Sequence, residues 1–162
     1  MKRACIAIVD AARARLYSYR DVDDSQELVE LVDLVSPGRR GKDSDLFSDA
    51  ASRAQPSGGA FHGSIDDHRN AHRDEMDSKF AAQVAHEIER LAKERGLGHV
   101  IFVTPARMLG VVRPHLEVMR KHGLLVDELE RDLSQLTAPQ LQEHLARLDV
   151  IEPRRRAVQP RR

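Results

Sequence analysis

The first residues that could carry chemistry are two adjacent glycines in a polar stretch, Gly58 and Gly59, with His62 close behind. Glycine lets a backbone approach another molecule closely and adopts φ values that other residues avoid. Exposed amide groups in such a loop could meet phosphate, and a hydrolase could use His62 together with them. The pair is not a phosphate-binding P-loop, because no Gly-Lys-Ser/Thr follows and no strand immediately precedes it. Plain flexibility remains the simpler interpretation of two glycines alone.

Histidines and acids cluster after the glycines and raise the question of a metal. The set comprises His62, Asp66, Asp67, His68, His72 and Asp74. On a helix, His68 and His72 would lie one turn apart, a spacing that can chelate zinc. A zinc-protease motif requires Glu at position 69, where this chain has Arg69, and Arg73 adds a second charge that repels a cation. We therefore expect no metal and no cofactor.

The same segment fits contacts with an RNA backbone better than a metal. Basic and histidine side chains recur near the glycines, at Arg69, His72, Arg73 and Lys79. A basic tail would add to them, since residues 154–162 contain five arginines and no acid, beginning with Arg154, Arg155 and Arg156. A solvated start of a helix is the alternative interpretation of these side chains.

Two further residues could act as a metal ligand or a nucleophile. Asp10 ends the first strand, where nucleases of the ribonuclease H type place a metal-binding carboxylate. Such sites need several converging carboxylates, and no second one is identifiable by spacing, so we expect Asp10 to cap a turn. Cys5, the only cysteine, lies in an apolar run and is expected to be a small buried hydrophobe.

Composition bounds the class of protein. The chain has 162 residues, which suits one domain over residues 1–150 followed by a disordered basic tail over 151–162. Its formal net charge is +0, so any contact with nucleic acid must come from a local patch. No apolar run is long enough to span a bilayer, and the run after Arg3 is too short for a signal peptide. These features predict a cytoplasmic protein without membrane contact.

Periodicity supplies the elements that must position these residues. Strands are expected over 4–9, 14–20 and 28–35, then a long polar loop over 36–73. A long helix follows to Gly96, and then a strand over 99–104. A helix over 107–122 comes next, and Pro114 must divide or kink it. A strand over 124–133 and a last helix from Thr137 to Leu148 complete the order. This order predicts an α/β mixed sheet, antiparallel in its first three strands and parallel afterwards. One core is expected to contain Cys5, Ile8, Val84, Ile88, Ile101 and Val103.

Several segments together resemble the bacterial host attachment proteins. They are VDAARARL at 9–16, GKDSDL at 41–46, SGG at 57–59, FVTPARMLG at 102–110 and DLS at 132–134. That family is similar to the central domain of archaeal and eukaryotic class I release factors and their Pelota-like relatives. The resemblance implies a ribonuclease H-like fold. In release factors a Gly-Gly-Gln loop promotes peptidyl-tRNA hydrolysis; here Ala60 replaces the Gln, and only Gly58 and Gly59 carry over.

Two functions from different classes follow. The resemblance favours a module that associates with the ribosome or tRNA and inserts the Gly58-Gly59 loop into an RNA site. The neutral charge favours a non-catalytic interaction or regulatory protein that affects host attachment indirectly. We expect no enzymatic activity; an active protein would resemble a peptidyl-tRNA hydrolase. The sequence leaves the oligomeric state open.

Overall fold

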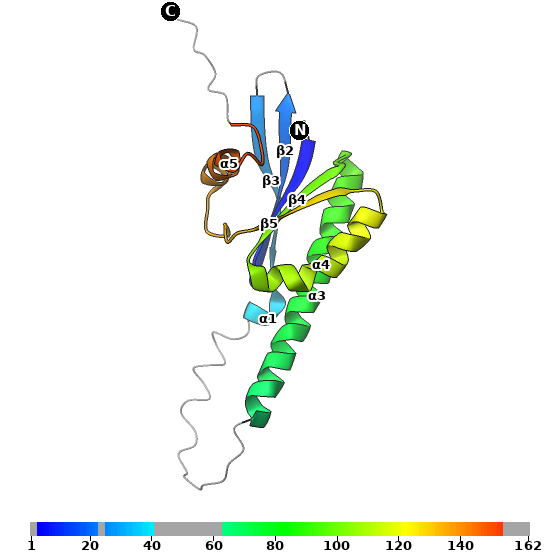
Figure 1. Cartoon of the computed structure of the whole chain (residues 1–162), viewed down its shortest axis with the longest axis vertical. Coiled ribbons are helices and arrows are strands. Elements are labelled where there is room, and N and C mark those ends of the chain that lie inside the picture. The colour runs from blue at the N-terminus through cyan, green and yellow to red at the C-terminus, as the bar shows by residue number, and fades with distance from the viewer. Residues whose placement is uncertain (1–2, 23–24, 41–62, 154–162) are drawn as a thin grey trace, which may run out of the picture.

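The structure is a computed structural model that describes residues 3–22, 25–40 and 63–153 (Figure 1). The glycine pair Gly58-Gly59, His62 and Arg154, Arg155 and Arg156 lie outside the described residues. The described strands are β1 (Arg3–Val9), β2 (Arg13–Val22), β3 (Ser25–Val35), β4 (His99–Thr104) and β5 (Leu125–Glu130). The described helices are α1 (Pro37–Arg40), α3 (Gly63–Arg95), α4 (Ala106–Lys121) and α5 (Ala138–Arg147).

The strands form one mixed sheet in the order β3-β2-β1-β4-β5. β1, β2 and β3 pair antiparallel, because short connections can only join neighbours that run in opposite directions. β4 pairs parallel to β1, and β5 parallel to β4, because α3 and α4 return the chain to the same end of the sheet. The predicted ribonuclease H-like α/β fold is therefore confirmed.

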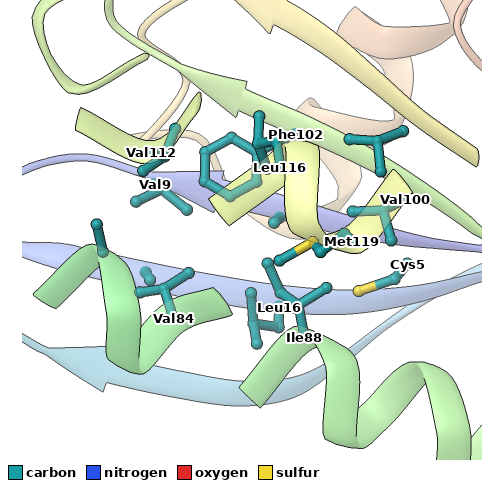
Figure 2. Close-up of a cluster of buried hydrophobic side chains, with 14 of the residues drawn as sticks. Cys5, Val9, Leu16, Val84, Ile88, Val100, Phe102, Val112, Leu116 and Met119 are labelled. Carbon is teal, nitrogen blue, oxygen red and sulfur yellow. The ribbon is translucent and has the colours of Figure 1, made fainter. Parts of the chain in front are cut away.

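Helices cover both faces of the sheet, and the core is split between them. α3 and α4 pack on one face and α5 on the other (Figure 1). Cys5 of β1 packs with Val84 and Ile88 of α3, as Figure 2 shows. The other three residues of the expected core lie in the cluster on the opposite face: Ile8, Ile101 and Val103.

The single expected core is thus wrong, and the period of a strand explains the error. Successive side chains of a strand point to opposite faces, so Cys5 and Ile8 of β1 cannot share one side of the sheet. The apolar runs in β1 and β4 are continuous because both faces of these central strands are buried.

The long polar loop ends earlier than the sequence predicts. Residues 63–73 belong to α3, and residues 37–40 form the short helix α1. The apolar residues there show no helical period, because residues 67–75 of α3 are all exposed and do not pack on the sheet. The segment is helical nonetheless, since no Gly or Pro interrupts the chain between Ser64 and Arg95.

The later elements follow the predicted order with shifted boundaries. α4 continues through Pro114 as one helix, so the proline does not divide it, although the ribbon in Figure 1 turns along its length. Pro114 is exposed, so its ring projects from the side of α4 that faces solvent. β5 is shorter than the predicted 124–133. The capping box is confirmed, because the Gln140 side chain accepts a hydrogen bond from the backbone N–H of Thr137 at 3.0 Å.

Candidate functional site

A cavity of about 340 Å³ opens at the carboxyl ends of β1 and β4, between α3 and the first turn of α4. In sheets of this kind ligands bind at the carboxyl ends of parallel strands. Two of the segments that carry the family resemblance meet here, one from residues 9–16 and one from residues 102–110. The lining residues are Asp10, Ala11, Ala12, Asp77, Pro105, Arg107 and Met108.

Asp10 caps the turn after β1, as the sequence predicts. The backbone N–H groups of Ala12 and Arg13 donate to Asp10 Oδ1 at 2.7 and 2.8 Å. The N–H of Asp10 donates to the carbonyl of Arg13 at 2.9 Å and closes the turn. Among the described residues, Asp10 Oδ2 has no hydrogen-bond partner, so one oxygen of this carboxylate is left over at the cavity.

Asp77 is a site residue that sequence reasoning missed. Its side chain is only 5% exposed, and its Oδ2 lies 3.3 Å from Arg107 Nη2. The same Nη2 lies 3.3 Å from Oδ1 of the exposed Asp74. In the sequence, Asp77 is one of several acids near the expected start of a helix. It nevertheless lies three residues before Phe80, which is buried. A polar residue on the apolar stripe of α3 was the signal that could have found it.

The first turn of α4 borders the same cavity through Arg107 and Met108. The N-cap residue is Pro105, and no side chain caps the helix. The N–H groups of the first turn have no intrahelical partner, which leaves those of Ala106, Arg107 and Met108 available. The hydroxyl of Thr104 donates to the carbonyl of Val9 at 2.7 Å and holds the ends of β1 and β4 together. The charged groups of the cavity are therefore the carboxylates of Asp10 and Asp77 and the guanidinium group of Arg107.

The predicted RNA-binding residues of α3 lie outside this cavity, on the part of the helix that projects beyond the sheet (Figure 1). Arg69, His72 and Arg73 are exposed. Lys79 is also exposed, but its Nζ lies 2.7 Å from Oε1 of Glu75. In the described part of the chain, Arg69 and Arg73 take part in no ion pair.

Nucleophile and metal chemistry find no support among the described residues. Cys5 is fully buried, and burial raises the pKa of its thiol to about 12, so the thiolate does not form near neutral pH. No group of three or more His, Cys, Asp or Glu side chains there could hold a metal ion.

None of the described helices is long and apolar enough to cross a membrane.

Comparison with known proteins gives a family, and the solved structures that resemble this chain include two with limited similarity. The archaeal translation termination factor aRF1 is 17% identical, with 93% of this chain and 35% of that chain covered and a TM-score of 0.44. The type II variant of the Aquifex aeolicus Ppx/GppA phosphatase is 16% identical, with 80% and 36% covered and a TM-score of 0.40. The chain thus spans about a third of each of these structures.

No curated protein matches the sequence. The model of one family, described as protein required for attachment to host cells, matches residues 5–145. That range takes in the sheet, α3, α4 and nearly all of α5. The chain therefore belongs to the family of proteins required for attachment to host cells.

Proposed function

We propose that this chain is an RNA-binding module that associates with the ribosome or tRNA, and that the projecting part of α3 contacts phosphates. One observation carries the proposal. Arg69 and Arg73 are one helical turn apart on a segment whose residues 67–75 are all exposed, and neither has an ion-pair partner among the described residues. A helix that is polar on all sides is expected to bridge to something outside its own domain.

Several arginines in the described part of the chain are already engaged. Seven of them form ion pairs with carboxylates: Arg13, Arg15, Arg90, Arg107, Arg113, Arg120 and Arg147. The guanidinium group is a planar fork of donors that matches a phosphate in a bidentate manner. Arg69 and Arg73 keep this capacity for an external anion.

Helix geometry gathers the basic side chains on one side of α3. At about 100° per residue, Arg69 and Arg73 point within roughly 40° of each other, and His72 lies beside them. Asp67, Asp74 and Glu75 point at least about 100° away from the two arginines, whereas Glu75 lies one turn beyond His72 and about 60° from it. The segment has no net positive charge, yet it presents a basic stripe formed by Arg69, His72 and Arg73.

The basic stripe lies where an RNA backbone could follow the helix. Arg69 and Arg73 are about 6 Å apart along the axis, a spacing that lets the two guanidinium groups bind different phosphates of one strand. The arginines of the tail, Arg154, Arg155 and Arg156, would supply further contacts. The proposed role is binding; no residue is assigned a catalytic step.

The test is binding to purified ribosomes and to tRNA across a salt series, with a variant in which Arg69 and Arg73 are both changed to Ala. The control changes Arg20 and Arg95 to Ala, since both are exposed and have no ion-pair partner among the described residues. If two phosphate contacts are lost, the slope of log affinity against log salt should flatten by about 1 to 2 in the first variant. The control should keep the slope of the unmodified protein.

Two results would count against RNA binding. One is the lack of any salt-sensitive binding by the unmodified protein. The other is an equal loss in the control, which would mean that only total charge matters. In the first case a non-catalytic protein-interaction role becomes the better account, and in the second case the projecting part of α3 is not the phosphate contact.

A further inference from the structure

A groove with a volume of about 570 Å³ lies at the other end of the sheet, where α3 ends and β4 begins. It is lined by the last turns of α3, by the glycine-containing link to β4 and by residues that follow α4. Figure 1 shows the end of α3 near the start of β1, far from the part of α3 that projects beyond the sheet. The groove therefore takes no part in the proposed RNA contact.

The apolar lining of the groove consists of Ala92, Leu97 and Leu124. Ala92 and Leu97 are only 5% and 2% exposed, so they lie below the surrounding surface. Gly96 and Gly98 keep the space above them open, because a Cβ at either position would meet no atom within 4 Å. An aliphatic side chain from a partner would remove this apolar surface from water, which is favourable.

Positive charge surrounds the apolar lining. Lys93 lines the groove, and Arg95 and Lys121 each stand next to a lining residue in the chain. All three are exposed and complement the helix dipoles, yet none has an ion-pair partner among the described residues. Glu89 is the acid in this lining, and its Oε1 lies 2.8 Å from Nδ1 of His122. The three cations can therefore meet an anionic partner.

A further cation reaches the groove from the sheet. The parallel register of β1 and β4 pairs Cys5 with the residue two positions after Gly98, so Arg3 lies beside Gly98. Arg3 points to the same face as Cys5, which α3 and α4 cover. Its antiparallel neighbour is Arg20, which in turn pairs with Glu27 of β3. Arg3 thus faces a second cation across the ladder and adds to the positive charge at this end of the sheet.

We propose that the groove binds an acidic peptide segment of a partner protein. An aliphatic side chain of the peptide occupies the apolar lining, and carboxylates on either side of it meet the surrounding cations. The buried side chain supplies most of the affinity, because a contact at the centre of an interface excludes water. The exposed cations select an acidic sequence and speed its association.

The lining favours a peptide over other anionic partners. An RNA base needs an aromatic surface on which to stack, and the ring in this lining is His122, which is held by Glu89. A membrane contact needs apolar side chains that project into the lipid, whereas Ala92 and Leu97 are recessed. The volume of the groove lies within the range of small-ligand sites, roughly 300–1,000 Å³, which suits one part of a peptide.

The groove and the basic stripe lie at opposite ends of one helix. Lys93 is 24 residues after Arg69 on α3, so the two are about 36 Å apart along the axis. A module with both contacts would link an RNA to an acidic protein. The groove shares no residue with the basic stripe, so the inference does not depend on the proposed function.

The experiment is a fluorescence anisotropy titration of the full chain against a labelled synthetic peptide, Glu-Asp-Glu-Leu-Leu-Glu-Asp-Glu. The matched peptide has serine in place of both leucines and keeps the same charge. It should bind about tenfold more weakly or worse, because it buries no apolar side chain. In NMR spectra the leucine peptide should shift the amide signals of Leu97, Gly98 and Leu124 and leave those of residues 67–75 in place.

Two variants connect the binding to the groove. Gly98→Leu places a side chain in the open space without a change of charge, so it should abolish binding; Gly110→Leu is its control, since Gly110 has equally open space on the exposed side of α4, outside the lining. Lys93→Glu should weaken binding about tenfold and decides the matter if Gly98→Leu does not fold. The variant with Arg69 and Arg73 changed to Ala should bind the peptide as the unmodified protein does.

The proposal is overturned if the leucine peptide fails to bind, if the serine peptide binds equally well, or if Gly98→Leu retains binding. Transfer RNA and phosphatidylglycerol vesicles serve as competing probes. Should Gly98→Leu weaken binding to either of them while the leucine peptide does not bind, the groove receives RNA or lipid and not a peptide.

Discussion

Changing Ile88 to Ala should destabilise the protein by about 2 to 5 kcal/mol. Ile88 is fully buried in the cluster between the sheet and helices α3 and α4 (Figure 2). The substitution removes three carbon atoms, and at about 0.8 kcal/mol for each the loss of burial alone gives roughly 2.4 kcal/mol. The cavity left behind adds the remainder. Ile101 is equally buried in the cluster on the other face, so Ile101→Ala should cost a similar amount.

The division of the core makes a sharper prediction for the double variant. Ile88 and Ile101 lie on opposite faces of the sheet, so their effects should add to within about 0.5 kcal/mol. Ile88 and Leu16 lie in the same cluster, and their double variant should depart from additivity by more than that. Urea unfolding of the single and double variants measures both quantities. A near-zero loss for either isoleucine, or strong coupling between Ile88 and Ile101, would refute the two-core arrangement.

Three other predictions concern the short helix α1, the ion pairs of the sheet and the residues at the proposed RNA contact. Gly38→Ala should destabilise the protein, because the new Cβ would collide with the Met76 side chain. Gly110→Ala has open space around the new Cβ in a helix, so it should be neutral or stabilising by up to about 1 kcal/mol, and urea unfolding compares the two variants. The hydrogen bond from Arg15 lowers the pKa of Glu30 in the folded state. The pair therefore stabilises the fold above the unfolded pKa of about 4.5, and this stabilisation is lost as the pH falls through the folded pKa. Glu30→Gln should flatten the fall in melting temperature between about pH 5 and 3. Deleting the chain from Arg154 onward should lower RNA affinity and flatten its salt dependence. Changing Gly58 and Gly59 to Ala should leave the affinity nearly intact, because glycines carry no charge. Filter binding with tRNA compares the two variants, and a large loss of affinity in the glycine variant would contradict the assignment of the phosphate contacts to the arginines.

The order of elements could be predicted because it depends on local patterns. The continuous apolar runs of β1 and β4 have the composition of strands buried on both faces, and Thr137 with Gln140 marks the start of α5. The start of α3 could not be predicted from apolar period, because residues 67–75 are all exposed and make no stripe against the sheet. Their helical state depends on intrinsic propensity and continuity with the packed part of the same helix.

The candidate cavity depends on contacts between distant parts of the chain. Asp10 and Arg107 are 97 positions apart, and they meet because β1 and β4 pair in parallel with Ile8 opposite Val103. No spacing rule in one sequence reveals that pairing. Asp77 was hidden for a different reason: an acid near the start of a helix is expected to be solvated, and only the direction of its side chain shows that it is buried.

The central claim is tested most directly by the salt dependence of binding to ribosomes or tRNA for the unmodified protein and for the variant with Arg69 and Arg73 changed to Ala. The account predicts that log affinity falls linearly with log salt and that the variant loses about 1 to 2 of that slope, while the control with Arg20 and Arg95 changed does not. Binding that is independent of salt, or a slope that the change of Arg69 and Arg73 leaves untouched, would contradict it.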